Sequence, residues 1–338
     1  MRPSSFLCSL SFRFPVRSSS STVAPLPVPT AFDNWLTAEL DNLRCLDEQP
    51  ETYKTGKWLL SALDISVATQ KMTIESLCDV IFRDDDREII QNYLADTVEL
   101  LDACNRLRER AETVQSYINS LRIVLHCLEG EAEPNQTALA RARLVLNSCE
   151  AMEKRCSELE KCSSGLRKLG EKCNSGSKLS GSYEPCMSGT DLHEVLNGSK
   201  AVALLACGTS AVALSFKSKH GLPMIQNRQM TTWSNSLHEL HRGVKEVIEK
   251  RRKSGSSLVL TELSEAVNAA KNLRDLINSR RRSENNSRKI EFRVNVEALK
   301  RSCEGSEEGI KPLEGRVNEL YRELISVRVA LLGILSQA

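Results

Sequence analysis

The chain of 338 residues contains 41% hydrophobic and 27% charged residues, a balance that can bury a full core and that excludes a chain disordered by composition. Aromatic residues make up only 4%, which leaves little for a β-sandwich core and favours helices. The formal net charge of +2 provides no global field for binding nucleic acid or an anionic membrane. Any such contact must therefore come from a local cluster.

Residues 1–31 form a Ser- and Pro-rich leader that carries Arg2, Arg13 and Arg17, and the first acidic residue of the chain is Asp33. No continuous apolar run is present, which argues against a secretory signal. Two interpretations stay open, a transit peptide and a disordered tail. The first predicts a chloroplast protein, and the second a cytoplasmic or membrane-associated one.

Residues 32–173 form the predicted N-terminal helical half. A short amphipathic helix starts at Phe32, and a longer one covers residues 55–82. Residues 93–128 carry apolar side chains at steps of three and four over five turns or more. A further long helix is predicted over residues 136–172, after a break at Gly130 and Pro134. We expect these last two helices to form an antiparallel hairpin.

A Ser- and Gly-rich linker is predicted over residues 174–190, followed by the C-terminal helical half, residues 191–338. Helices are expected over residues 192–216, 233–253 and 258–279. The last helix is expected to follow a break at Gly305 to Gly309. It carries a heptad stripe that is a candidate partner-binding surface: Ile310, Leu313, Val317, Leu320, Leu324, Val327 and Leu331.

Together these patterns predict an all-α fold, an elongated antiparallel helical bundle with coiled-coil-like helices. Just over three heptads are too few to argue for a long parallel coiled coil. An intramolecular bundle is therefore favoured for the last helix, and self-association is the rival interpretation.

The strongest local anomaly is the uncharged segment 201–216, AVALLACGTSAVALSF, which lies between Lys200 and Lys217. A bilayer span wants about 20 apolar residues, with a lower limit near 17. Three interpretations stay open, a buried central helix, a marginal membrane span and an interfacial contact. The candidate residues are Ala201, Leu204, Leu205, Val212, Leu214 and Phe216.

Two basic clusters, residues 250–253 and 280–282, lie at predicted helix C-termini. Cations there complement the helix dipole, which is the favoured interpretation, and a lipid-headgroup or nuclear-import role is the alternative. No aromatic residues interleave with these clusters, as a single-stranded nucleic-acid platform would require. No nucleic-acid partner is predicted.

Catalytic, cofactor and metal motifs are absent from the sequence, so no catalytic residue, no cofactor and no metal site is predicted. His238 and His241 are expected on a solvent face, and metal binding there is disfavoured. The twelve cysteines include no C-x-x-C pair, and we expect most of them to be reduced. Cys104, Cys149, Cys156 and Cys173 fall on apolar stripes, where free cysteine packs as a small hydrophobe.

Three stretches carry a resemblance to a known family: KWLLSALDISVATQKMTIESL (57–77), YLADTVELLDACN (93–105) and GSKAVALLACGTSAVALSF (198–216). In this order they resemble the plant BYPASS family, and LLDACN is the most specific of the motifs. The resemblance covers most of residues 32–335, whereas the N-terminus matches only in its general character.

The resemblance implies a non-enzymatic plant developmental regulator that restrains a root-derived mobile signal and so prevents arrest of shoot and leaf growth. It also implies, as an alternative, a membrane-associated adaptor of exocyst-type vesicle tethering. Protein partners, including exocyst subunits, and a membrane contact through residues 201–216 are expectations from this resemblance.

Overall fold

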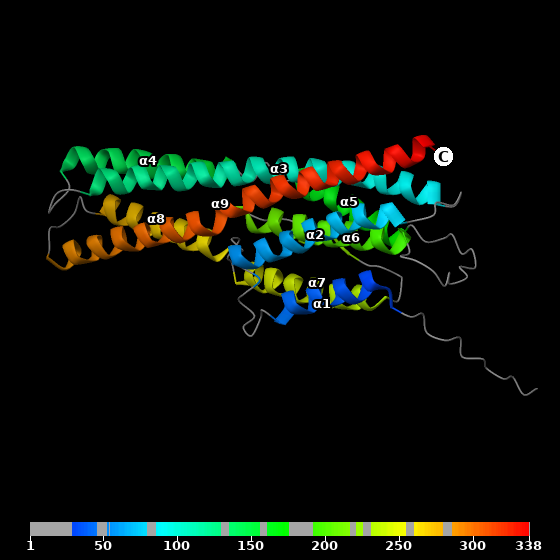
Figure 1. Cartoon of the computed structure of the whole chain (residues 1–338). Helices are drawn as coiled ribbons and strands as arrows, with labels where there is room; N and C mark the ends of the chain where they lie inside the picture. Colours follow the sequence, from blue (N-terminus) through cyan, green and yellow to red (C-terminus); the bar gives the residue numbers. More distant parts are fainter. Residues whose placement is uncertain are drawn as a thin grey trace, which may run out of the picture.

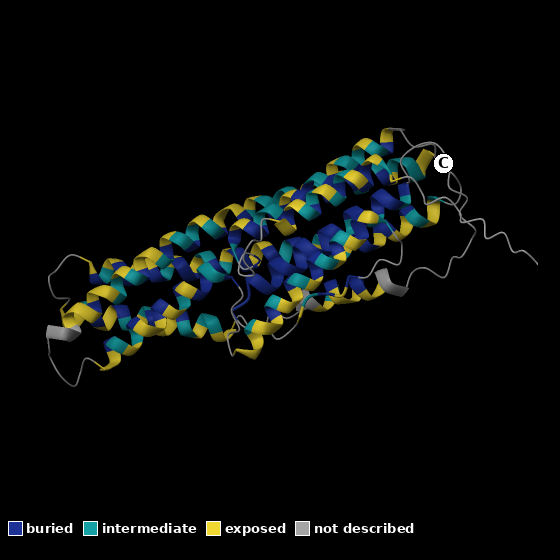
Figure 2. Ribbon diagram, turned by 90° about the horizontal axis from the view of Figure 1, so that it is seen from below, coloured by how far each residue is buried: buried dark blue, intermediate teal, exposed yellow. Residues whose placement is uncertain are grey.

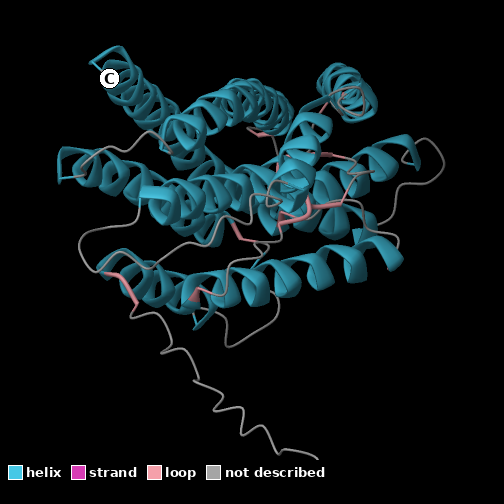
Figure 3. Ribbon diagram, turned by 90° about the vertical axis from the view of Figure 1, so that its right-hand side faces the viewer, coloured by secondary structure: helices cyan, strands magenta, loops and turns pink. Residues whose placement is uncertain are grey.

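The structure, a computed structural model, describes residues 29–45, 53, 55–79, 86–129, 135–155, 161–175, 192–216, 221–225, 231–254, 260–279 and 286–337. Within these ranges the chain forms helices and no strand, as the end-on view in Figure 3 shows. The all-α prediction is confirmed. The helices are α1 (Ala31–Cys45), α2 (Gly56–Asp79), α3 (Asp86–Leu128), α4 (Gln136–Arg155), α5 (Lys161–Ser175), α6 (Leu192–Ala213), α7 (Thr232–Lys253), α8 (Thr261–Ser279) and α9 (Asn286–Gln337).

Two long helices, α3 with 43 residues and α9 with 52, run side by side along the molecule and give it the elongated shape seen in Figure 1. Their polar contacts show that they run in opposite directions. Arg122, near the end of α3, pairs with Glu307 in the first half of α9. Arg328, near the end of α9, donates to Thr97 Oγ1 near the start of α3 at 2.6 Å.

At one end of the molecule, two hairpins of helices pack against each other. The α3–α4 hairpin, predicted from the sequence, is joined by Tyr117, which donates its hydroxyl to Glu153 at 2.9 Å. The α8–α9 hairpin is joined by Ser306, whose hydroxyl donates to the Glu262 carbonyl at 2.9 Å. Arg274 on α8 reaches Glu150 on α4 at 2.7 Å and so connects the two hairpins.

At the other end, α6 lies among α2, α3, α5 and α7, while α1 and α7 lie side by side in an outer layer (Figure 1). The first turn of α7 is bonded to α1, because the Trp233 backbone N–H donates to Asp33 Oδ1 at 2.9 Å. Not all neighbours are antiparallel. Contacts of Asp64 and Lys71 with Arg316 and Glu319 show that α2 runs parallel to α9.

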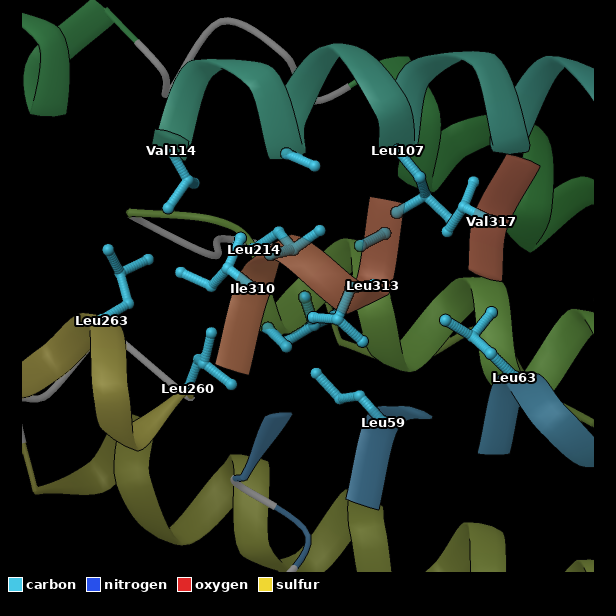
Figure 4. Packing of buried hydrophobic residues seen from close by; sticks show 14 of the residues in the cluster. Leu59, Leu63, Leu107, Val114, Leu214, Leu260, Leu263, Ile310, Leu313 and Val317 are labelled. Atoms are coloured by element: carbon cyan, nitrogen blue, oxygen red, sulfur yellow. The ribbon is translucent and has the colours of Figure 1, made fainter. Parts of the chain in front are cut away.

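The larger of two hydrophobic clusters among the described residues is the main core; the smaller one includes Ile90, Tyr93 and Val327. In Figure 4, side chains from α2, α3, α8 and α9 meet around Leu214, which directly follows α6. Figure 2 shows buried residues along the inner faces of the helices and exposed residues outside. Each fully buried Leu or Ile contributes about 1.5–3 kcal/mol. The main core contains residues of both predicted halves, so the two halves share it. Residues 176–191, which include most of the proposed linker, lie outside the described residues.

The predicted break at Gly305 to Gly309 is wrong, because α9 continues through both glycines and through Pro312. Packing explains this continuity. A Cβ added at Gly56 would lie 2.6 Å from the carbonyl oxygen of Gly309, so the start of α2 rests directly on the backbone of α9. The buried residues Ile310 and Leu313 then hold the same segment in the core. Tertiary packing outweighs the low helix propensity of Gly and Pro here.

The single long helix predicted over residues 136–172 is also corrected, since the structure has two helices, α4 and α5, with residues 156–160 outside the described ranges. The two helices have different neighbours. Besides α3, which both contact, α4 packs against α8 and α5 packs against α6. Leu166 and Leu169 of α5 are buried in the main core.

Candidate interaction surfaces

The uncharged segment 201–216 is a central element of the core. Its candidate residues Ala201, Leu204, Leu205, Val212, Leu214 and Phe216 are all buried. Of the interpretations left open by the sequence, the structure has the buried central helix. Within the described residues, α6 is the one helix long and apolar enough to cross a membrane, and most of it is buried inside the bundle. A buried core helix passes the same test of length and composition.

Polar bonds tie α6 to its neighbours at both ends. Lys200 forms an ion pair with Asp96 of α3 at 3.0 Å, with both side chains nearly buried. Tyr93 donates its hydroxyl to Gln70 of α2 at 2.8 Å, and Gln70 in turn donates its amide to the Ser199 carbonyl at 3.3 Å. Burial raises the pKa of Tyr93 to about 12, so this phenol stays protonated at neutral pH.

The other end of α6 is held by Arg110, a buried residue of α3 that sequence reasoning missed. Its guanidinium donates to the Ala211 carbonyl at 2.7 Å and also bonds the Ser215 hydroxyl. A cation at the C-terminus of a helix complements the helix dipole. These contacts position α6 within the bundle.

The candidate partner-binding stripe on α9 faces the core. All of its members are at most 2% exposed: Ile310, Leu313, Val317, Leu320, Leu324, Val327 and Leu331. They pack mainly against α2 and α3. The chain's own helices therefore cover this stripe, which agrees with the favoured intramolecular bundle, and the stripe is not accessible as a partner-binding surface in this structure.

A second apolar face of α9 is exposed, and the sequence analysis missed it. Ile325, Val329 and Leu332 are 37%, 64% and 51% exposed and follow one another at steps of four and three, which places them on one side of the helix. No charged residue occurs after Arg328. The absence of charge from residues 329–338 is the sequence feature that could have predicted a helix with more than one apolar side. We call these three residues the α9 outer face.

Other large apolar side chains are exposed on the two hairpins at the opposite end. Leu144 on α4 is 71% exposed, Ile123 on α3 54%, and Ile290 and Val294 on α9 66% and 58%. Single exposed hydrophobic residues are normal on protein surfaces. They provide comparison sites for the α9 outer face.

A cleft of about 210 Å³ separates α4 from α8. Its apolar floor includes Leu146 and Val267, and its rim includes Glu153 and Lys271. The Glu150–Arg274 ion pair bridges the two helices at this cleft. Opposite charges of similar number line the rim, so the cleft has no strong preference for a cation or an anion.

Cys104 and Cys149 are buried and free, as predicted for packing residues, and so are Cys207 and Cys303, whereas Cys45 and Cys78 are exposed. Burial raises the pKa of Cys149 to about 12 and that of Cys303 to about 11. Thiols with raised pKa values are poor nucleophiles, because the thiolate is the reactive form. Cys156 and the side chain of Cys173 lie outside the part of the chain that the structure describes.

The two histidines of α7 differ. His238 is exposed as expected, but His241 is buried, and its Nε2 lies 2.9 Å from the Pro223 carbonyl oxygen. Residues 221–225 cover His241 through this contact. The helical pattern of α7 alone does not reveal that these residues lie there. Burial lowers the pKa of His241. Within the described part of the chain, no group of three His, Cys, Asp or Glu side chains could hold a metal ion.

Sequence comparison finds similarity between this chain and plant proteins. Residues 197–335, from α6 to the end of α9, match the family model described as "Protein ROH1-like". The chain is 27% identical over 225 residues to UPF0496 protein 4 of Oryza sativa subsp. indica and equally to that of subsp. japonica. Those matches cover 65% of this chain and 48% of each relative, so the chain spans about half the length of the curated relatives it matches.

No solved structure matches the chain. The matches support similarity to plant ROH1-like and UPF0496 proteins, and neither printed name states an activity. Residues 1–28 of the leader and the second basic cluster, residues 280–282, lie outside the described residues.

Proposed function

We propose that this chain is a non-enzymatic plant protein that regulates development through protein–protein contacts, and that it restrains a root-derived mobile signal that arrests shoot and leaf growth. The observation that carries the contact role is the α9 outer face. Its apolar side chains are exposed on a helix whose other side is fixed in the core. The developmental role rests on the BYPASS resemblance and on the similarity to plant proteins.

The fold supports a contact role because it offers a long, rigid surface. α9 is anchored along its inner side by residues that are almost fully buried, so its outer face is held in a fixed position. A preorganised apolar surface binds a partner with a smaller loss of conformational entropy than a mobile one. Self-association is the rival use of the same surface.

The test replaces Ile325, Val329 and Leu332 together by serine in the full chain. A control replaces Leu144 and Ile123, which are 71% and 54% exposed and lie at the other end of the molecule, by serine. Each variant is expressed in a plant line that lacks the protein. We expect the α9 variant to leave shoot arrest uncorrected and to lose partners in proximity labelling, while the control rescues growth.

Circular dichroism and light scattering of the purified variants accompany this test. Rescue of growth by the α9 variant with an unchanged partner set would refute the proposed surface. A change from dimer to monomer in the α9 variant alone would instead assign the surface to self-association.

The second candidate function is a membrane-associated adaptor of exocyst-type vesicle tethering, with exocyst subunits as partners. The observation that favours a membrane contact is the length and apolar character of α6. Either a span or a peripheral contact through α6 would require this helix to leave the core, because its apolar side chains are buried. Complete release of the native protein by carbonate extraction would exclude a span.

Chloroplast targeting by residues 1–31 is a further part of the proposal. A C-terminal fluorescent fusion of the full chain is compared with one that lacks residues 1–30. Plastid import that is lost on truncation supports a transit peptide. Equal distribution of the two fusions supports a cytoplasmic or membrane-associated protein.

A further inference from the structure

The end of α7 carries four consecutive cations, Lys250, Arg251, Arg252 and Lys253, which we call the α7 basic end. It is the only run of four consecutive basic residues in the sequence. Three of the residues are exposed and Arg251 is half-buried. Consecutive residues of a helix are about 100° apart, so these side chains encircle the end of the helix.

Among the described residues, these cations have no side-chain partner. None of them forms a side-chain hydrogen bond or an ion pair with another residue. Elsewhere on α7 the cations are paired, since Arg242 contacts Glu239, and Lys245 lies 4.0 Å from Glu249. The α7 basic end is therefore an uncompensated positive cluster on a helix whose other cations are neutralised.

Capping of the helix does not account for the cluster. Ser254 satisfies free carbonyl groups at the end of α7, since its backbone N–H donates to the Lys250 carbonyl at 3.1 Å. The Ser254 hydroxyl donates to the Arg251 carbonyl at 2.8 Å. Lysine and arginine side chains often bond the last carbonyl groups of a helix. The basic side chains of α7 do not form such bonds here.

The position of α7 makes these charges accessible. α7 lies with α1 in the outer layer of the bundle (Figure 1). Its apolar side, with Trp233, Leu240 and Val244 buried, faces the core. The helix is fixed from inside while its charged end remains in solvent.

We propose that the α7 basic end binds an anionic lipid surface. Clusters of four or more lysines and arginines on an amphipathic helix are attracted to negatively charged headgroups, and each cation near the surface strengthens binding about fivefold. Residues 242–254 contain no aromatic side chain on which bases could stack, and the net charge of +2 provides no extended field along a nucleic acid. A compact ring of cations fits a flat anionic surface better.

The proposal is independent of the protein-contact role, because it concerns another helix and needs no protein partner. The test is flotation of the purified full chain with vesicles of phosphatidylcholine alone and with vesicles that contain equal amounts of phosphatidylserine and phosphatidylcholine. We expect binding only to the second kind. Binding should weaken strongly from about 0.1 M to about 1 M salt, as the Debye length falls from about 10 Å to about 3 Å.

The variant replaces all four residues of the α7 basic end by glutamine, and we expect a loss of vesicle affinity of several hundredfold, about fivefold for each of the four cations. A control removes the same charge from scattered positions, by Lys57→Gln, Arg87→Gln, Lys311→Gln and Arg322→Gln. All four control cations are exposed and none has an intramolecular partner in the structure. The control should lose affinity only slightly.

Three outcomes would overturn the proposal. One is the same affinity for the basic-end variant and the unaltered chain, with any change confined to thermal stability, which would assign the cations to the helix dipole. Another is an equal loss in the control, which would make net charge the cause. The third is tighter binding to duplex DNA than to the vesicles at equal salt, with both lost in the variant.

Discussion

Replacing Gly56 by alanine is expected to force α2 away from α9. The added Cβ would lie 2.6 Å from the Gly309 carbonyl oxygen and 2.9 Å from its Cα. Both are backbone atoms, so no side-chain rotation can relieve the clash. The same movement would weaken the hydrogen bond from the Gly56 N–H to Glu262 Oε1, now 2.8 Å. Overpacking typically costs about 1–3 kcal/mol, and we expect the upper part of that range because a hydrogen bond is also disturbed.

The matched control is Gly315→Ala, in the same long helix. No atom lies within 4 Å of a Cβ added there. Alanine should therefore gain helix propensity of about 1 kcal/mol without a steric cost. Urea unfolding followed by circular dichroism measures both free energies of unfolding. Equal stability of Gly56→Ala and the unaltered chain would refute the close contact between α2 and α9, and a loss for Gly315→Ala would refute the open environment.

Three further predictions concern residues on α3, α6, α7 and α9. Leu324→Ala should cost about 2–5 kcal/mol of unfolding free energy because Leu324 is fully buried. Val329→Ala on the α9 outer face should change it by no more than about 0.5 kcal/mol. Equal costs in thermal unfolding would contradict the orientation of α9. Asp96→Ala should lower the unfolding free energy by about 3–5 kcal/mol because it leaves the nearly buried Lys200 ammonium unpaired. A double variant with Lys200→Met should recover part of that loss. No recovery in urea unfolding would count against the ion pair. Burial lowers the pKa of His241 below the value of about 6.5 in the unfolded chain, so the unfolded state takes up more protons as the pH falls through that value. The free energy of unfolding should therefore decrease from about pH 7.5 to about pH 5.5, and His241→Gln should reduce this decrease. An unchanged pH dependence in the variant would rule out His241 as its source.

The sequence by itself determined the helical class and most helix positions. Periodicity located the inner side of α3 and the inner stripe of α9 correctly, since Leu107, Leu121 and Leu320 are all fully buried. It did so because an amphipathic helix in water must bury one side, and that requirement is local in the sequence. The buried state of Cys104 and Cys149 followed from the same periodicity.

Only the tertiary structure decided which helices cover one another and which apolar sides stay exposed. Periodicity shows that a stripe such as that of Leu320 needs a partner, but not whether α2 and α3 or another protein supplies it. The continuity of α9 through Gly309 depends on the backbone of α2, and the burial of His241 depends on residues 221–225. These contacts join residues far apart in the chain, and their free energies exceed the local propensities on which sequence patterns depend.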